Sequence, residues 1–288
     1  MNPLIGVASF LCLTLNMIFW SSLLFLVGSI RLVIPSKNWK KLWTSVTIFV
    51  GETCISFNNA WIKILLRPSI SITGMENLEK QHWYIATSNH QSWGDIFILQ
   101  KITNRKIPLL RFFMKDVLKW IPIVSIVGWA LDMPFLKRYS KEQMEKNPSL
   151  KGKDVEQMKK AFKRLETNPG PVFSFAEGTR FTQQKHKDQN SPFENLLRPK
   201  AGGIGVALST MPFITTLLDL SISYNSDSNS FWSFLCGGMS DIKIKVRSIE
   251  IPEDLLNKDY SKDSQFRNDL KDWLNQIWEE KDRFLSST

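Results

Sequence analysis

A long apolar stretch opens the chain, with no charged side chain from Met1 to Ile30. The segment Leu4 to Ile30 is long enough to span a hydrocarbon core of ~30 Å, which needs about 20 apolar residues. A cleaved signal peptide is disfavoured, because no Lys or Arg precedes the apolar run and the run is too long. Since Asn16, Ser21 and Ser22 interrupt it, a re-entrant or interfacial hairpin stays open as an alternative. Attachment to a membrane is therefore predicted, without a fixed topology.

Positive charge follows this stretch, because four basic residues occur before the first acid, Glu52. They are Arg31, Lys37, Lys40 and Lys41. By the positive-inside tendency, the rest of the chain is expected on the cytoplasmic side. The next stretch, Trp43 to Leu66, is amphipathic and predicted to be helical. It either lies on the bilayer surface or packs on the following domain.

From about Ile70 onward the pattern changes to short apolar runs that alternate with amphipathic stretches, which favours an α/β domain. One helix, Asp154 to Leu165, leads over a short Asn-Pro-Gly turn into an apolar run, as expected for parallel strand–helix–strand units. A second helix is predicted from Phe266 to Trp278, and the polar stretch Gln183 to Asn195 is expected to be a surface loop. The predicted strands are Trp83 to Ser88, Pro171 to Phe175, Leu217 to Tyr224 and Ile242 to Val246.

The amino-acid composition limits the class of binding partner. The net charge is +10, and the chain holds 11 Trp and 19 Phe residues. Positive charge attracts nucleic acid or anionic lipid, and no motif of a nucleic-acid reader occurs here. With an apolar N-terminus, lipid is the predicted partner and nucleic acid is not. Cys12, Cys54 and Cys236 are far apart, without a C-x-x-C pair, so we expect buried thiols rather than disulfides or a zinc site.

His90 and Asp95 form the first candidate site, in Asn89-His90-Gln91-Ser92-Trp93-Gly94-Asp95 directly after a predicted strand. Ligand sites in α/β folds lie just beyond strand ends. Five positions along an ideal helix rotate by ~500°, so the two side chains meet only across a turn, which Gly94 permits. The carboxylate would then hold the Nδ1 proton and leave Nε2 free to accept a proton. The alternative is a capping histidine and an unrelated aspartate.

A second polar motif, Glu177-Gly178-Thr179-Arg180, follows another predicted strand. Arg180 offers a planar fork suited to phosphate, and Thr179 and backbone N–H groups can add donors. Glu177 is expected to hold this loop or a neighbouring cation rather than to attack a substrate. An ordinary charged turn is the alternative.

Between these motifs lies the apolar run Leu109 to Leu131, which packs in the core or else forms an apolar groove or a membrane-facing lip. Lys137 and Arg138 follow it. They complete an anion pocket or stand as a solvated strand end.

In order and spacing, three motifs resemble motifs one to three of the glycerolipid acyltransferases: the HX4D pair His90 and Asp95, Phe135 to Arg138, and Glu177 to Arg180. The resemblance covers about Trp83 to Met211. The sequences of Trp93-Gly94-Asp95 and of Ala130 to Pro134 resemble the YihG-type bacterial branch, which is close also to eukaryotic lysocardiolipin-type members. The resemblance extends further to Lys115, Leu118, Pro122 and Gly128 before motif two, Lys200-Ala201-Gly202 after motif three, and Met211-Pro212-Phe213-Ile214 as a loose motif four.

This resemblance implies a mixed, mostly parallel sheet flanked by helices, with an N-terminal helical element on the membrane. It implies a membrane segment over residues 1–36, an amphipathic or interfacial segment over 37–69 and an acyltransferase catalytic domain over 70–288. The site residues it implies are His90 as base, Asp95 as its orienter, Arg138, Glu177, Gly178, Thr179 and Arg180 at the substrate phosphate, and Lys115, Lys137, Lys200 and Pro212 as further candidates.

The implied reaction moves an acyl chain from acyl-CoA or acyl-carrier protein to a lysophospholipid hydroxyl, without a covalent intermediate, a cofactor or a metal. The leading acceptor is 1-acyl-sn-glycerol-3-phosphate, which gives phosphatidic acid, and lysophosphatidylglycerol is an alternative. The expected location is the bacterial inner membrane. Hydrolysis is disfavoured, because no G-x-S-x-G elbow occurs and Ser92 lies too near His90. A non-catalytic lipid-binding protein is the remaining alternative.

Overall fold

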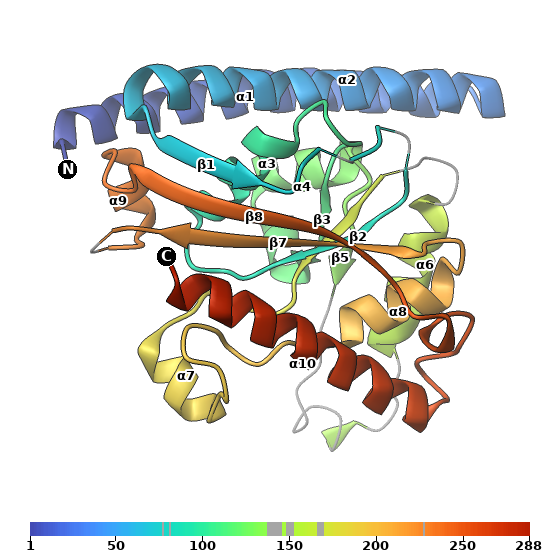
Figure 1. Ribbon diagram of the computed structural model, residues 1–288. Coiled ribbons are helices and arrows are strands. Elements are labelled where there is room, and N and C mark those ends of the chain that lie inside the picture. The colour runs from blue at the N-terminus through green and yellow to red at the C-terminus, as the bar shows by residue number, and fades with distance from the viewer. Residues whose placement is uncertain (77, 81, 137–145, 148–152, 166–169, 227) are drawn as a thin grey trace.

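A six-stranded mixed sheet lies between two layers of helices in the computed structural model of the chain (Figure 1). The description applies to residues 1–76, 78–80, 82–136, 146–147, 153–165, 170–226 and 228–288. The strand order is β1-β8-β7-β2-β6-β3. All neighbouring strands are parallel except β7 and β8, which are antiparallel. The strands are β1 Ser69–Thr73, β2 Ile85–Ser88, β3 Arg111–Phe112, β6 Val172–Phe175, β7 Thr216–Tyr224 and β8 Asp241–Glu250.

Two very short strands, β4 Met114–Lys115 and β5 Phe135–Leu136, form a separate parallel pair. The long helices are α1 Pro3–Val33, α2 Lys37–Trp61 and α10 Ser264–Ser286. The other helical segments are η1 Ile62–Leu66, α3 Gly94–Thr103, η2 Asp116–Trp120, α4 Pro122–Ala130, α6 Lys153–Leu165, α7 Gln183–Gln189, α8 Gly202–Thr210, α9 Phe231–Leu235 and η4 Glu253–Leu255.

Helices α1 and α2 lie side by side along one face of the molecule, and α10 crosses the opposite face (Figure 1). The polar residue Asn16, which interrupts the first apolar run, lies at the contact between α1 and α2. Its Nδ2 donates to Asn58 Oδ1 at 2.9 Å and to the Cys54 carbonyl at 3.2 Å. At the end of α1, Arg31 Nη1 is 2.8 Å from Asp132 Oδ2, which joins α1 to the turn after α4. The N-terminal hairpin is therefore docked on the rest of the chain.

The outer face of this hairpin stays apolar and exposed. Among the described residues, α1 is the one helix long and apolar enough to cross a membrane, and most of its span is unburied. Cys54 and Cys236 are buried as predicted, but the prediction for Cys12 is wrong, because it lies on this outer face of α1 beside exposed Leu11 and Leu15.

The predicted strands are all present, with ends shifted by a few residues, and so are the helices predicted near residues 154–165 and 266–278. The prediction of a loop over Gln183 to Asn195 is wrong in its first half, which forms α7. Thr182 caps this helix, since its Oγ1 accepts from the Lys185 N–H at 3.3 Å. All residues of this helix are polar, so its sequence lacks the apolar periodicity by which a helix is predicted.

Candidate functional site

The two polar motifs meet beyond the carboxyl ends of two neighbouring strands of the sheet. Strands β2 and β6 are parallel neighbours, and Ser88 at the end of β2 lies opposite Phe175 at the end of β6. The chain leaves both strands at their carboxyl ends, where ligand sites form in open α/β sheets. The loop of His90 and the loop of Arg180 are brought together in this way.

His90 and Asp95 are in contact across a turn, as their spacing requires. His90 Nδ1 lies 2.8 Å from Asp95 Oδ2. Helix α3 begins at Gly94, so Asp95 stands in its first turn. The same Oδ2 accepts from the N–H groups of Gln91 at 2.8 Å and Ser92 at 3.0 Å. Because an ionised carboxylate only accepts, Nδ1 carries the imidazole proton and Nε2 is left as an acceptor.

Asp95 has another partner that the sequence did not indicate. The Tyr224 hydroxyl, at the end of β7, donates to Asp95 Oδ1 at 2.6 Å. Burial raises the pKa of Tyr224 well above its usual value, and the charge of Asp95 and this hydrogen bond raise it further. The phenol therefore keeps its proton and acts as a donor. Its one signal in the sequence is its place at the end of the predicted strand Leu217 to Tyr224.

Aromatic rings surround the His90 imidazole. Phe175 stacks on it with ring centroids 3.8 Å apart and an interplanar angle of 13°. Trp93 stands edge-on, with centroids 6.5 Å apart. His90 is only 9% exposed. These contacts fix the plane of the ring.

Glu177 joins the two loops. Its Oε1 accepts from the His90 N–H at 3.0 Å, and its Oε2 accepts from the Leu197 N–H at 3.1 Å. Burial raises the pKa of Glu177 to about 8, although both N–H donors oppose this shift. Grouping Glu177 with the phosphate-binding residues is therefore corrected, because its carboxylate is fully buried and occupied by backbone groups. It positions the loop, which is the first role that the sequence suggested.

The rest of the Glu177-Gly178-Thr179-Arg180 motif faces outward. Gly178 has a φ of 71°, a left-handed conformation that glycine adopts without strain. Lys185, at the start of α7, donates to Thr179 Oγ1 at 2.8 Å and to the Arg180 carbonyl at 3.0 Å. The Arg180 guanidinium lies 5.3 Å from the ring centroid of Trp93. A cationic group thus stands beside the ring that also flanks His90.

The other candidates differ in their places. Lys137 and Arg138 lie outside the described residues. Lys115 is exposed and aligned with Leu136 in the β4–β5 pair, next to that segment. Lys200 is exposed, and its N–H donates to the Ala176 carbonyl at 2.8 Å, so it adjoins the second motif.

Pro212 is not brought into the site. It precedes β7, which begins beside the start of β2, whereas His90 follows the end of β2. Its neighbour Phe213 contacts Trp83, just before β2, with ring centroids 5.1 Å apart. Pro212 therefore lies near the amino end of β2, whereas His90 follows its carboxyl end. Its inclusion among the site candidates is corrected accordingly.

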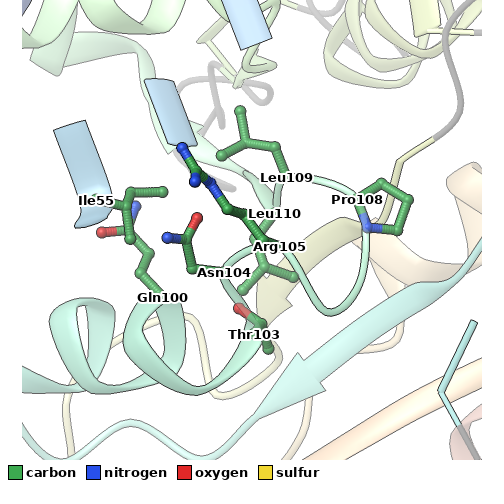
Figure 2. A pocket seen from close by; sticks show the side chains of 8 residues that line it. All are labelled: Ile55, Gln100, Thr103, Asn104, Arg105, Pro108, Leu109 and Leu110. Carbon is green, nitrogen blue, oxygen red and sulfur yellow. The ribbon is translucent and has the colours of Figure 1, made fainter. Parts of the chain in front are cut away.

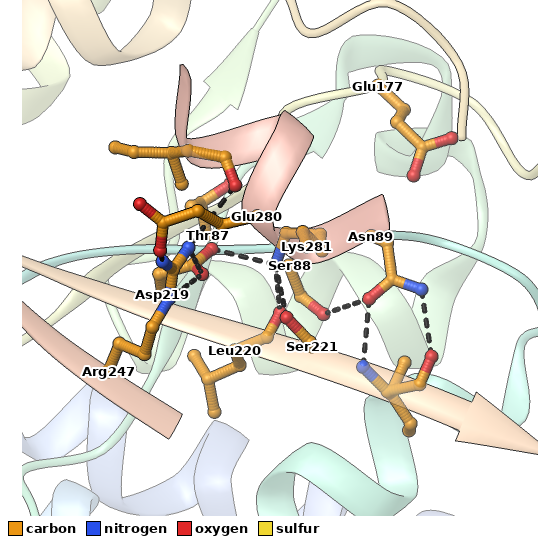
Figure 3. Close-up of polar contacts among 12 residues, drawn as sticks. Thr87, Ser88, Asn89, Glu177, Asp219, Leu220, Ser221, Arg247, Glu280 and Lys281 are labelled. Carbon is orange, nitrogen blue, oxygen red and sulfur yellow. Dashed lines mark hydrogen bonds and ion pairs between the residues drawn. The ribbon is translucent and has the colours of Figure 1, made fainter. Parts of the chain in front are cut away.

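Asn89 fixes the chain just before His90. Its Oδ1 accepts from the Ile222 N–H and its Nδ2 donates to the Ile222 carbonyl, both at 2.9 Å (Figure 3). An asparagine side chain thereby continues the pairing of β2 with β7 beyond Ser88. Sequence reasoning missed this role, because the partner lies 133 residues away.

A buried ionic cluster supports β7 from the side of α10 (Figure 3). Lys281 Nζ lies 2.7 Å from Asp219 Oδ1 and donates to the Leu220 carbonyl at 2.6 Å. Arg247 Nη2 donates to Asp219 Oδ2 at 2.7 Å. Burial lowers the pKa of Lys281, whereas Asp219 acts in the opposite direction. The cluster ties α10 to the strand that carries Tyr224.

One small pocket lies away from these groups, between α2 and the end of α3 (Figure 2). Its volume is about 10 Å³, which is room for about one water molecule and for no lipid. Its lining residues are Ile55, Gln100, Thr103, Asn104, Arg105, Pro108, Leu109 and Leu110.

The family model described as "Acyltransferase" matches residues 69–222, more than half of the chain. A 1-acyl-sn-glycerol-3-phosphate acyltransferase 3 from Arabidopsis thaliana is 27% identical over 210 residues, covering 67% of this chain and 52% of the relative. A 1-acyl-sn-glycerol-3-phosphate acyltransferase from Saccharomyces cerevisiae is 29% identical over 122 residues, covering 41% of this chain and 35% of the relative. The chain thus spans about half or less of the length of these curated relatives.

Among solved structures, the fold is similar to the 1-acyl-sn-glycerophosphate (LPA) acyltransferase PlsC from Thermotoga maritima. The TM-score is 0.58 at 18% identity, and the match covers 97% of this chain and 95% of that one. The predicted fold, a mixed and mostly parallel sheet flanked by helices with an apolar N-terminal helix, is confirmed.

Proposed function

This chain belongs to the acyltransferase family, and on that premise we propose that it transfers an acyl chain to the free hydroxyl of a lysophospholipid. The proposed acceptor is 1-acyl-sn-glycerol-3-phosphate, which both similar curated proteins carry in their names. The product would be phosphatidic acid. Assignment to the YihG-type branch stays a prediction.

One observation carries the proposal: His90 Nδ1 is held 2.8 Å from Asp95 at the strand ends, beside the loop of Arg180. In the proposed reaction, His90 Nε2 accepts the proton of the acceptor hydroxyl as its oxygen attacks the thioester carbonyl. The tetrahedral intermediate then collapses, the carbon–sulfur bond breaks, and the thiolate receives the proton from His90. Asp95 stabilises the imidazolium that forms in between.

The acceptor phosphate is proposed to bind on the Gly178 to Arg180 loop, with Arg138 contributing from the neighbouring motif. Arg180 is exposed and supplies a planar pair of donors, and Lys185 braces the loop through Thr179. Lys200 adjoins this loop, because its N–H donates to the Ala176 carbonyl, and both Lys115 and Lys200 stay candidates for a supporting role. The acyl donor is proposed to be acyl-CoA or acyl-carrier protein, and since a thioester is already activated, the chemistry requires neither a cofactor nor a metal.

We propose that the enzyme works at a bilayer surface, with α1 and the η2 turn in contact with lipid. The exposed fractions of Leu15, Phe19 and Leu26 on α1 are 67%, 62% and 57%, and those of Val117 and Trp120 in η2 are 65% and 86%. Since α1 packs on α2, α4 and α9, the hairpin is proposed to rest its outer face in the bilayer. The inner membrane of a bacterium, with the catalytic domain on the cytoplasmic side, stays the proposed location.

The test is a panel of lysolipids with labelled acyl-CoA and acyl-carrier protein, assayed with the wild type, His90→Ala and His82→Ala. His82 is a matched control, because it lies at the opposite edge of the sheet and contacts Thr216. We expect transfer to 1-acyl-sn-glycerol-3-phosphate to fall by about 10²–10⁴-fold in His90→Ala and to persist in His82→Ala. Full activity in His90→Ala, or release of free fatty acid without an acylated product, would overturn the proposal.

A further inference from the structure

We propose that Tyr224 is a positioning residue of the reaction, which holds the Asp95 carboxylate in the orientation that His90 requires. This inference rests on the proposed function and extends the pair of His90 and Asp95 by a third group. Tyr224 belongs to none of the acyltransferase motifs in the sequence. Its place near His90 comes from the pairing of β7 with β2.

The geometry places Tyr224 level with the turn that carries His90. Strands β2 and β7 are parallel, with Ser88 opposite Leu220, and Asn89 bonds to Ile222. Tyr224 follows two residues later and is the last residue of β7. Its side chain therefore reaches Asp95 from the sheet rather than from the loop.

The donors to Asp95 divide into two groups. Oδ2 accepts from His90 Nδ1 and from the N–H groups of Gln91 and Ser92, all within five residues of Asp95. Oδ1 accepts from Tyr224, which is 129 residues away, at 2.6 Å. The local donors move with the turn, whereas Tyr224 is fixed to the central sheet. Its hydroxyl thus ties the orientation of the carboxylate to a rigid element.

Loss of this hydroxyl has a specific consequence. Asp95 is fully buried, so Oδ1 could not exchange Tyr224 for bulk water. Without that hydroxyl, no donor fixed to the sheet would hold the rotation of the carboxylate, and Oδ2 would no longer be kept in line with His90 Nδ1. Because Tyr224 contacts Asp95 and the proposed acceptor sites lie on the Arg180 loop, the loss should lower kcat and leave KM largely unchanged.

Tyr224→Phe removes only the hydroxyl, and Tyr84→Phe is its matched control. Tyr84 is also buried, and its hydroxyl accepts from the Glu79 N–H at 3.0 Å, just before β2 and away from His90. The full chain is assayed in detergent with lysophosphatidic acid and acyl-CoA, and melting temperatures are measured in parallel. We expect kcat to fall by about 10-fold or more in Tyr224→Phe, with KM within about twofold, since hydrogen bonds to charged groups are among the stronger ones. Tyr84→Phe should keep kcat within about twofold.

Three results would overturn the proposal: an unchanged kcat in Tyr224→Phe, an equal loss in Tyr84→Phe, or failure of Tyr224→Phe alone to fold, which would make the hydroxyl a general stabiliser. If the wild type transfers acyl chains to no lysolipid, the proposed function fails separately. The rate at which diethyl pyrocarbonate modifies His90 then tests Tyr224. We expect that rate to change in Tyr224→Phe and not in Tyr84→Phe, and equal rates in all three proteins would contradict the positioning role.

Discussion

At the scale of single residues, burial determines what the charged groups around His90 do. Glu177 and Asp95 are both fully buried and both accept backbone N–H donors, but Asp95 does so within its own turn, whereas Glu177 joins the His90 turn to Leu197. Asp95 additionally faces an imidazole and a phenol, so its charge is used by the proposed chemistry. Glu177 accepts hydrogen bonds from backbone N–H groups. Its raised pKa therefore makes the free energy of unfolding depend on pH.

Glu177→Gln should change how stability depends on pH. The pKa of Glu177 is about 8 in the folded chain against 4.5 for an ordinary glutamate, so the folded state binds more protons between these values. The stability contribution is therefore present below pH ~4.5 and is lost as pH rises through 8. We expect the free energy of unfolding of the wild type to fall, relative to that of Glu177→Gln, by an amount on the order of a few kcal/mol between pH 5 and 8.

Unfolding curves at four pH values would measure this, with Glu250→Gln as the control because Glu250 is exposed at the end of β8. A constant difference between wild type and Glu177→Gln across the range would refute the expectation.

The residues that sequence reasoning missed share one property. Tyr224, Asn89 and Lys281 act through partners 129, 133 and 61 residues away, so no local pattern marks them. His90 and Asp95 could be found because both partners stand in one short segment after an apolar run. Lys185 is the exception, since it lies only five residues beyond Arg180, and the wrong prediction of a loop hid it.

At the scale of elements, close contacts dock α1 on the rest of the chain. A Cβ on Gly28 would lie 2.7 Å from the Trp129 ring of α4, closer than ordinary contact. Gly28→Val should therefore push α1 from α4 and lower stability by about 1–3 kcal/mol, although valine suits a helix better than glycine does.

Melting temperature measures the effect of Gly28→Val, and Ser22→Val is its control, because Ser22 is exposed on the same helix. Equal melting temperatures for the two variants would show that α1 does not need this close approach.

The buried cluster makes a second prediction for an element, α10. Lys281→Met leaves the Asp219 carboxylate with Arg247 alone, and breaking a buried ion pair costs about 3–5 kcal/mol. The double variant Lys281→Met with Asp219→Asn should recover part of this loss, because the buried charge is removed as well. Chemical denaturation of both variants checks the order, and a double variant less stable than Lys281→Met would contradict it.

The type of an element was predicted correctly where burial imposes a periodic pattern of apolar residues on the sequence. Strands β2, β6 and β7 are short apolar runs, and α6 and α10 have apolar residues at helical spacing. The apolar run at Leu109 to Leu131 resolved into several short elements, with Leu109 and Leu131 buried and Trp120 at 86% exposure. Core packing therefore holds for part of that run, and the apolar groove or membrane-facing lip stays a prediction for its exposed part.

At the scale of the whole molecule, most of the large exposed apolar residues belong to α1, α2 and the segment of η2 and α4. The η2 turn is expected to contribute to lipid contact together with α1. Trp120→Ser combined with Val117→Ser should weaken binding to vesicles of anionic phospholipid, because both side chains are largely exposed.

Co-sedimentation with such vesicles would measure the change, and the matched control is Phe213→Ser. Phe213 is 47% exposed but precedes β7 at the opposite edge of the sheet from His90. An equal loss of binding in both proteins would show that η2 has no special contact with lipid.

The peptide unit of His90 is gripped on both sides by one loop, since its N–H donates to Glu177 and its carbonyl accepts from Phe181 at 2.7 Å. If this loop binds the head group as proposed, substitutions that change its shape would also shift the imidazole. Gly178 and Thr179 stand between these two partners in the sequence, so a substitution there has to keep the spacing of Glu177 and Phe181 for His90 to stay in place.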